Sequence, residues 1–160
     1  NMWDKKRPVF VFGAGGAAEA ILHFLKIEKI KDITIFNRTK SRANKILRDY
    51  KQIKFVNNIN NLNLKEAGLI INTTSLGMIG YPELDLDLKS INKNAVVYDI
   101  VYNPINTKLI LNAKKEKLLT VSGLDMFIEQ AKSSFEIWFN IKPKDDAKLI
   151  ANIKKEITKK

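Results

Sequence analysis

The 160-residue chain has no cysteine and a single histidine, His23. The absence of cysteine excludes disulfides, thiolate metal sites and a cysteine nucleophile. One histidine excludes the zinc sites that need two or three imidazoles. No apolar run approaches the roughly 18–20 residues of a membrane-spanning helix, and residues 1–7 lack the apolar segment of a secretory signal. We therefore expect an intracellular, cytoplasmic protein that binds neither a metal nor a membrane.

Acidic residues are scarce relative to basic ones. Lys and Arg number 28 against 17 Asp and Glu, which gives a net charge of +11. Such a charge can serve nucleic-acid binding. However, only four of the basic residues are Arg, whereas base recognition and strong phosphate binding favour Arg and aromatic side chains. The many Lys, Ile and Asn residues are also typical of AT-rich coding sequence, so we expect no nucleic-acid partner.

Six short apolar runs alternate with amphipathic stretches along the chain. Runs of this kind are typical of strands buried on both faces of a parallel sheet, and we expect them at 9–12, 32–36, 53–56, 69–71, 95–98 and 118–121. Apolar side chains at helical spacing predict helices at 16–29, 40–50, 107–115, 124–139 and 144–157, with a loop containing a short helical turn at 57–67. The alternation predicts a single α/β domain over residues 1–160. We expect a Rossmann-type, doubly wound parallel sheet of about six strands with helices on both faces.

A glycine-rich turn follows the first expected strand directly. Gly13, Gly15 and Ala18 fit the pattern G-x-G-x-x-A. The first glycine permits a tight turn, the second lets the backbone approach a pyrophosphate, and the small third residue lets helix and strand pack closely. Free N–H groups at the start of the helix would bind the anion. A turn used only for packing is the alternative, but the strand–turn–helix context favours a dinucleotide site. The Glu19 carboxylate should then point away from the phosphates.

The end of the second expected strand indicates which dinucleotide binds. Asn37 stands where NAD-binding units usually carry an acidic residue for the ribose hydroxyls. Arg38 can pair with phosphate oxygens, Arg42 lies one helical turn beyond it, and Thr39 can cap the helix. Basic side chains at a helix start oppose the helix dipole unless an anion binds there. This segment favours NADP over NAD.

Four motifs in order resemble the shikimate dehydrogenase family. They are the glycine loop with Asn37-Arg38-Thr39, Ile71-Asn72-Thr73-Thr74-Ser75-Leu76-Gly77-Met78, Tyr98-Asp99-Ile100-Val101-Tyr102-Asn103-Pro104, and Gly123-Leu124-Asp125-Met126-Phe127-Ile128-Glu129-Gln130-Ala131 followed by Phe135-Glu136-Ile137-Trp138. They extend over residues 9–143, and the family usually has glycine at the position of Asp125. The resemblance implies the C-terminal NADP-binding domain of an oxidoreductase. That enzyme interconverts 3-dehydroshikimate and shikimate in aromatic amino-acid (chorismate) biosynthesis.

The resemblance also implies a role for particular residues. It assigns the pyrophosphate to Gly13, Ala14, Gly15, Gly16 and Ala17, the 2′-phosphate to Asn37, Arg38, Thr39 and Arg42, the cofactor groove to Thr73, Thr74 and Ser75, the nicotinamide half to Ile100, Gly123 and Met126, and the substrate to Tyr102 and Gln130. These segments are expected at the carboxyl ends of strands, where ligands bind in open α/β sheets. Met126 and Phe127 on a helix are more often part of a core, and we expect Asp99 to have a structural hydrogen-bonding role.

Full-length members of that family have an additional N-terminal domain that carries the catalytic Lys–Asp pair. We assign no catalytic residue to this chain and expect it to be inactive alone, with apolar surface that allows a homodimer. A fragment, half of a split enzyme and a stand-alone protein all stay open, as do shikimate and quinate as substrate. Two other functions stay open as well. One is the NADP domain of a glutamyl-tRNA reductase-like enzyme, against which residues 98–104 and 123–130 argue. The other is a non-catalytic, regulatory NADP-binding module.

Overall fold

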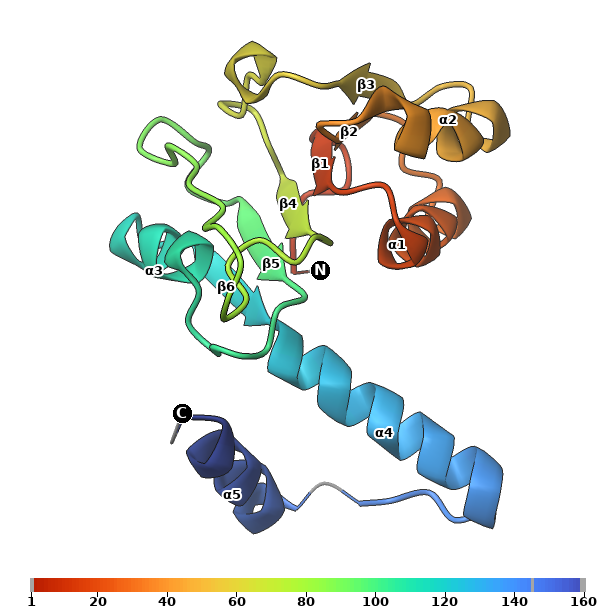
Figure 1. The fold of residues 1–160 in the computed structure, drawn as a ribbon, viewed down its shortest axis with the longest axis vertical. Helices are drawn as coiled ribbons and strands as arrows, with labels where there is room; N and C mark the ends of the chain where they lie inside the picture. The colour runs from red at the N-terminus through yellow and green to blue at the C-terminus, as the bar shows by residue number, and fades with distance from the viewer. Residues whose placement is uncertain (1, 145, 159–160) are drawn as a thin grey trace.

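A computed structural model describes residues 2–144 and 146–158. Its centre is a six-stranded sheet in the order β3-β2-β1-β4-β5-β6, in which every neighbouring pair is parallel. The strands are β1 (Val9–Phe12), β2 (Ile33–Phe36), β3 (Lys54–Val56), β4 (Leu69–Asn72), β5 (Val96–Asp99) and β6 (Leu119–Ser122). The helices are α1 (Gly16–Ile27), α2 (Lys40–Asp49), the short 3₁₀ turn η1 (Ile59–Asn61), α3 (Lys108–Lys115), α4 (Gly123–Phe139) and α5 (Ala147–Thr158) (Figure 1). The predicted doubly wound fold is confirmed.

Two apolar cores lie on opposite faces of the sheet. Successive side chains of a strand point to opposite faces, so Val9 and Val11 of β1 join one core and Phe10 and Phe12 join the other. The first core is completed by α1 and α2, and the second by α3 together with the loop between β4 and β5. All four residues of β1 are buried, which explains why this strand reads as a continuous apolar run.

The loop between β4 and β5 covers the sheet where a helix would otherwise lie. Leu84, Leu86 and Leu88 are buried in the second core, whereas Asp85 and Asp87 between them are exposed. This alternation is that of an extended segment with one apolar side. The second core is therefore closed by extended chain and by α3.

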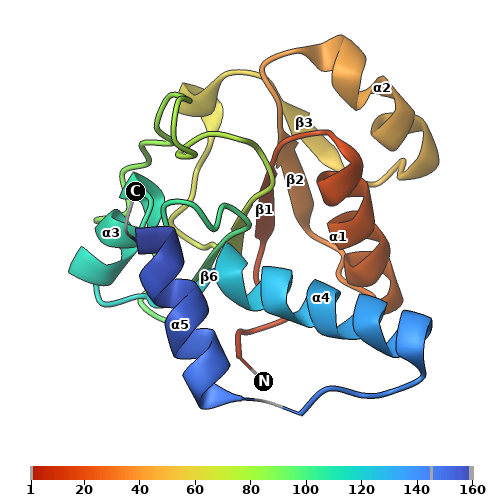
Figure 2. The same ribbon diagram turned by 60° about the horizontal axis from the view of Figure 1, so that its bottom comes forward.

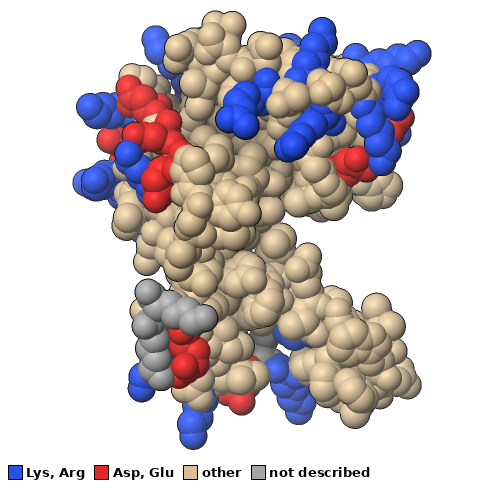
Figure 3. Space-filling model, in the orientation of Figure 1, with Lys and Arg blue, Asp and Glu red and all other residues tan. Residues whose placement is uncertain are grey.

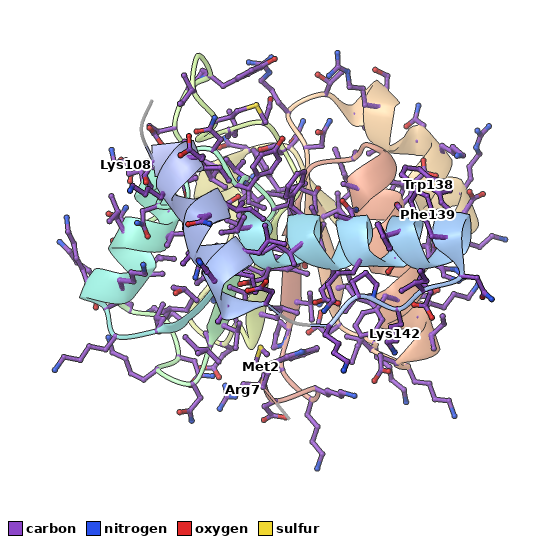
Figure 4. All side chains as sticks on the ribbon, turned by 90° about the horizontal axis from the view of Figure 1, so that it is seen from below. Met2, Arg7, Lys108, Trp138, Phe139 and Lys142 are labelled. Atoms are coloured by element: carbon purple, nitrogen blue, oxygen red, sulfur yellow. The ribbon has the colours of Figure 1, made fainter. Side chains whose placement is uncertain are left out.

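The last two helices stand apart from the sheet. Figure 1 shows α4 leaving β6 and extending away from the sheet, and Figures 1 and 2 show the chain returning through α5. Figure 4 labels Trp138 and Phe139 at the end of α4 that is far from β6. Ile137 is 81% exposed and Trp138 is 74% exposed, values that are high for large apolar side chains. The expected apolar surface is present on α4.

The final helix begins later than the sequence predicts. We expect it from residue 144, but it starts at Ala147 because Asp146 caps it. The Asp146 Oδ1 atom accepts hydrogen bonds from the backbone N–H groups of Lys148 and Leu149 at 2.9 and 3.0 Å, which is the usual geometry of an N-cap.

In the described parts of the chain, no helix is both long enough and apolar enough to cross a membrane.

Candidate functional site

The carboxyl ends of five strands lie in one row. The parallel register pairs Phe36 with Phe12, Phe12 with Asn72, Asn72 with Asp99, and Asp99 with Ser122. The residues directly after these ends therefore form a second row at the same edge of the sheet, and they are Gly13, Asn37, Thr73, Ile100 and Gly123. Each is the first residue of a segment that the sequence assigns to the cofactor. The structure thus brings all five segments to the edge where ligands of open α/β sheets bind.

Gly13 turns the chain between β1 and α1. Its φ angle is +114°, and a Cβ atom there would lie 2.5 Å from the Thr73 Oγ1 atom. A side chain is thus excluded both by the backbone conformation and by Thr73. The Gly13 N–H donates to the Phe36 carbonyl at 2.8 Å, which fixes the turn against β2.

The loop beyond Gly13 is open to solvent. Gly15, Gly16 and Ala17 are exposed, and a Cβ atom on either glycine would meet no other atom within 4 Å. Gly15 is the N-cap of α1 and offers no side-chain acceptor. The first N–H groups of an α-helix have no partner within the helix, so an anion can bind here through backbone N–H groups and the positive end of the helix dipole.

The one carboxylate in the first turn of α1 is held by another helix. Glu19 accepts a hydrogen bond and ion pair from Lys45 Nζ of α2 at 2.8 Å. The hydrogen bond to Glu19 raises the pKa of Lys45, and the charge of Glu19 adds to the effect. This pair was not predicted from the sequence. In this pair, the positive charge of Lys45 compensates the negative charge of Glu19 beside the anion-binding loop. Lys45 is therefore already paired and is not free to bind an anion.

The start of α2 is strongly basic and lacks acidic residues in its first turn. Asn37 donates from Nδ2 to the Thr39 carbonyl at 2.7 Å, which shapes the turn after β2. Arg38 and Arg42 are exposed, and no described residue forms an ion pair or hydrogen bond with either guanidinium. Figure 3 shows Lys and Arg side chains gathered over this part of the molecule. Unpaired guanidinium groups at a helix N-terminus are arranged for an anionic ligand.

Thr39 occupies the N-cap position of α2, but its side chain makes no capping hydrogen bond. The expectation that Thr39 caps this helix through its hydroxyl is therefore wrong. Its backbone carbonyl accepts from the Arg42 N–H at 3.2 Å instead. The hydroxyl stays exposed beside Arg38 in the sequence.

The Thr73 and Thr74 hydroxyls build the turn after β4. Thr73 donates to the Phe12 carbonyl at 2.7 Å, and Thr74 donates to Asn72 Oδ1 at 2.7 Å while accepting from the Leu76 N–H at 3.0 Å. Ser75 is partly exposed, and none of the described residues hydrogen-bonds to its hydroxyl. Of these three expected groove residues, Ser75 has the hydroxyl that remains available to a ligand.

A buried polar network joins β4 to β5. Asn72 donates from Nδ2 to Asp99 Oδ1 at 2.9 Å, and Thr107 donates to Asp99 Oδ2 at 2.6 Å. The Val101 N–H donates to Asp99 Oδ1 at 3.0 Å. Burial raises the pKa of the Asp99 carboxyl above its ordinary value, although these three hydrogen bonds act in the opposite direction. The structural role expected for Asp99 is confirmed, whereas the role of Asn72 was not predicted.

Gly123 allows β5 and α4 to come into direct contact. A Cβ atom at this position would lie 2.0 Å from the Ile100 carbonyl oxygen, so no side chain fits. The Gly123 N–H donates to the Val101 carbonyl at 3.3 Å, and the Ile100 N–H donates to the Asn72 carbonyl at 3.1 Å. These contacts fix the backbone where the nicotinamide half is expected.

Two aromatic rings lie close to the contact between Ile100 and Gly123, one on each of the two segments that this contact joins. The Tyr102 and Phe127 rings stack with centroids 4.9 Å apart and an interplanar angle of 23°. Tyr102 is 37% exposed and Phe127 is 40% exposed. Phe127 therefore lies outside the core, contrary to what its apolar character suggests. The stack places an aromatic surface at the carboxyl edge of the sheet.

Met126 and Gln130 line an open groove of about 730 Å³ along one side of α4. Its other lining residues are Tyr98, Asp125, Glu129, Ser133, Ser134 and Ile137. Burial raises the pKa of Tyr98, and the nearby carboxylates of Asp125 and Asp99 raise it further. The Gln130 side chain is exposed and can therefore hydrogen-bond to a ligand in the groove.

Two family profiles match this chain. The family profile described as shikimate / quinate 5-dehydrogenase matches residues 3–121, and the profile of the shikimate 5′-dehydrogenase C-terminal domain matches residues 123–147. A curated shikimate dehydrogenase (NADP(+)) of Chelativorans sp. (strain BNC1) is 42% identical over 144 residues. The match covers 88% of this chain and 51% of the relative. The chain thus spans about half the length of that protein.

Solved structures show the same similarity. Shikimate dehydrogenase from Thermotoga maritima is 34% identical with a TM-score of 0.73, and the match covers 96% of this chain and 57% of the other. A shikimate dehydrogenase solved in complex with NADP⁺ is 29% identical with a TM-score of 0.71, covering 98% of this chain and 55% of that one.

Proposed function

Since this chain belongs to the shikimate / quinate 5-dehydrogenase family, we propose that it is the cofactor-binding half of an NADP-dependent shikimate dehydrogenase. The complete enzyme interconverts 3-dehydroshikimate and shikimate. One observation carries the proposal: five separate segments with the expected ligand-binding residues begin in one row at the carboxyl edge of the sheet. The relatives described above are shikimate dehydrogenases, which supports the same activity.

We assign the two phosphate-bearing parts of NADP, the pyrophosphate and the 2′-phosphate, to two parts of this edge, one rich in free N–H groups and one rich in basic side chains. The free N–H groups of residues 14–17 hold the pyrophosphate, and Arg38 and Arg42 hold the adenosine 2′-phosphate. Asn37 supports NADP over NAD because it adds no negative charge beside that phosphate. When bound, the cofactor supplies hydride transfer at its nicotinamide ring. Ser75, Ile100 and Met126 orient that ring, with Thr73, Thr74 and Gly123 fixing the backbone around it.

Two further residues are assigned to the substrate. We propose that the Tyr102 hydroxyl and the Gln130 amide hydrogen-bond to substrate hydroxyls. A reaction at a secondary alcohol also needs a group that takes up the hydroxyl proton, and we assign none among the described residues. We propose that this group lies in the part of the enzyme that corresponds to the rest of the relatives' length. We also propose that residues 1–160 form a single domain that works together with that part. Quinate remains the alternative substrate, since the family includes both activities.

Calorimetric titration of the chain with NADP⁺ and, separately, NAD⁺ tests this function. We expect NADP⁺ to bind and NAD⁺ to bind roughly tenfold or more weakly, because only NADP⁺ carries the phosphate that pairs with arginine. Failure of both to bind would contradict the proposal. Binding of tRNA with a steep salt dependence would instead favour a glutamyl-tRNA reductase-like domain. Binding without turnover when a catalytic half of the family is added would favour a regulatory module.

The apolar end of α4 supports a further part of this proposal. Ile137, Trp138 and Phe139 are more than half exposed, as are Ile141 and Leu149 after them. We propose that this surface is covered by the rest of the enzyme, and that in this chain alone it pairs two copies into a homodimer. Sedimentation of the wild type and of Trp138→Lys tests the homodimer. A wild type that stays monomeric at high concentration would contradict it.

A further inference from the structure

The backbone around Tyr102 is held from three sides. The Val101 N–H donates to Asp99 Oδ1 at 3.0 Å, and the Val101 carbonyl accepts from the Gly123 N–H at 3.3 Å. On the other side of Tyr102, the Asn103 carbonyl accepts from the Ile79 N–H at 3.4 Å. The Cα atom of Tyr102 therefore has a fixed place at the edge of the sheet.

The side chain of Tyr102 is much less restricted. Its ring is 37% exposed, and within residues 2–144 and 146–158 nothing hydrogen-bonds to its hydroxyl. Among the residues that the structure describes, the ring that contacts it is that of Phe127, at 4.9 Å between centroids. A stacked neighbour of this kind stabilises one orientation of an otherwise mobile aromatic side chain.

Phe127 is itself placed by the contact between β5 and α4. It lies four residues after Gly123 and hence on the same side of the helix. Gly123 sits against the Ile100 carbonyl with no room for a side chain, and Leu124 beside it is fully buried. The first turn of α4 is therefore fixed against the end of β5, and Phe127 is held one turn further along the same side.

We infer that Phe127 is a positioning residue that holds the Tyr102 ring so that its free hydroxyl faces the substrate. This inference rests on the proposed function, because it takes Tyr102 as a substrate contact. Phe127 touches neither substrate nor cofactor in this role. It acts by reducing the number of orientations that Tyr102 can adopt before a substrate hydroxyl arrives, and pre-ordering of this kind strengthens binding.

Fluorine NMR of the chain labelled with 3-fluorotyrosine tests the inference, with the Tyr102 signal assigned from Tyr102→Phe. Phe127→Leu removes the ring but keeps an apolar side chain. We expect it to shift the Tyr102 signal in the ligand-free chain. With NADP⁺ present, we expect the shikimate concentration at half-maximal change of this signal to rise roughly 3- to 10-fold, the effect of losing one aromatic stack. Phe127→Trp, which keeps a ring, should restore much of the affinity.

Phe135→Leu is the matched control. Phe135 lies on the same helix, is also 40% exposed, and is paired with another ring, that of Phe139. Its loss should change neither the Tyr102 signal nor the shikimate midpoint.

Each outcome of these experiments is decisive. An unchanged Tyr102 signal in Phe127→Leu overturns the inference. So does a changed signal with an unchanged shikimate midpoint, because the stack would then be structural only. A wild type in which NADP⁺ binds but shikimate leaves the Tyr102 signal unmoved also overturns it. By contrast, a wild type that binds no NADP⁺ contradicts the proposed function itself, which is measured before any variant is made.

Discussion

Asn72 and Asp99, 27 residues apart in the sequence, join the ends of two neighbouring strands through a buried hydrogen bond of 2.9 Å. Both side chains are completely buried. Asn72 uses its other polar atom for the next turn, since its Oδ1 accepts from the Thr74 N–H at 3.0 Å. One asparagine thus fixes both the partner strand and the loop that follows its own strand. It links the sheet to the cofactor edge.

Asn72→Ala should destabilise the fold strongly. The substitution removes the donor to Asp99 and the acceptor of Thr74, and it leaves polar groups buried without these partners. We expect a loss of roughly 3 kcal/mol in the free energy of unfolding, measured by urea denaturation. Asn94→Ala, at an exposed position, is the control and should change it by less than about 0.5 kcal/mol. Equal effects of the two substitutions would show that the network contributes little.

Asp99 makes stability depend on pH in a defined direction. Its folded-state pKa is raised by burial, so its contribution to stability is fully present below the ordinary Asp pKa. That contribution is lost as pH rises through the raised value. Asp99→Asn removes the ionisation. The free energy of unfolding of this variant, minus that of the wild type, should therefore increase as the pH rises above the ordinary Asp pKa.

Urea denaturation at several pH values measures this difference. Asp87→Asn, at an exposed position, corrects for the general effect of removing one carboxylate. A difference that stays constant with pH, or falls as pH rises, would contradict the direction of the Asp99 shift.

Alanine substitutions at two glycines should distinguish an effect on the stability of the fold from an effect on NADP⁺ binding. Gly123→Ala places a Cβ atom 2.0 Å from a backbone oxygen, and we expect it to destabilise the fold by roughly 3 kcal/mol. Gly15→Ala meets no atom within 4 Å, and we expect a smaller loss of about 1 kcal/mol, because alanine is a poorer N-cap than glycine. Its methyl group nevertheless occupies the approach of a pyrophosphate. Calorimetry should show NADP⁺ binding weakened at least roughly tenfold by Gly15→Ala, and unweakened binding would contradict the assignment of this loop.

The sequence alone was sufficient for the fold because its signals are local. The continuous apolar run of β1 and the glycine turn at Gly13 each follow from neighbouring residues. Features that join distant segments could not be predicted in this way. The Glu19–Lys45 pair and the Asn72–Asp99 bond depend on which strands and helices become neighbours. The stack of Phe127 on Tyr102 likewise depends on the contact between β5 and α4, and a phenylalanine on a helix is more often part of a core.

Arg38 should decide between the two nicotinamide dinucleotides. Its guanidinium is exposed, and it makes no contact with a carboxylate among the described residues, so it can pair with the 2′-phosphate without first losing another partner. Arg38→Ala should weaken NADP⁺ binding roughly 10- to 100-fold, the effect of losing a charge-assisted pair. It should leave NAD⁺ binding almost unchanged, because NAD⁺ has no phosphate at that position. Calorimetric titration with both dinucleotides gives the two affinities.

Arg48→Ala controls for the loss of a positive charge from the same helix. Arg48 is also exposed, but it lies in the last turn of α2, ten residues after Arg38. A nonspecific effect of charge would weaken NADP⁺ binding similarly in both variants and would vanish as salt screens it. A direct contact instead weakens binding in Arg38→Ala alone and persists at moderate salt. Equal losses in the two variants would therefore place the 2′-phosphate elsewhere, and the next residue to substitute would be Arg42, one helical turn beyond Arg38.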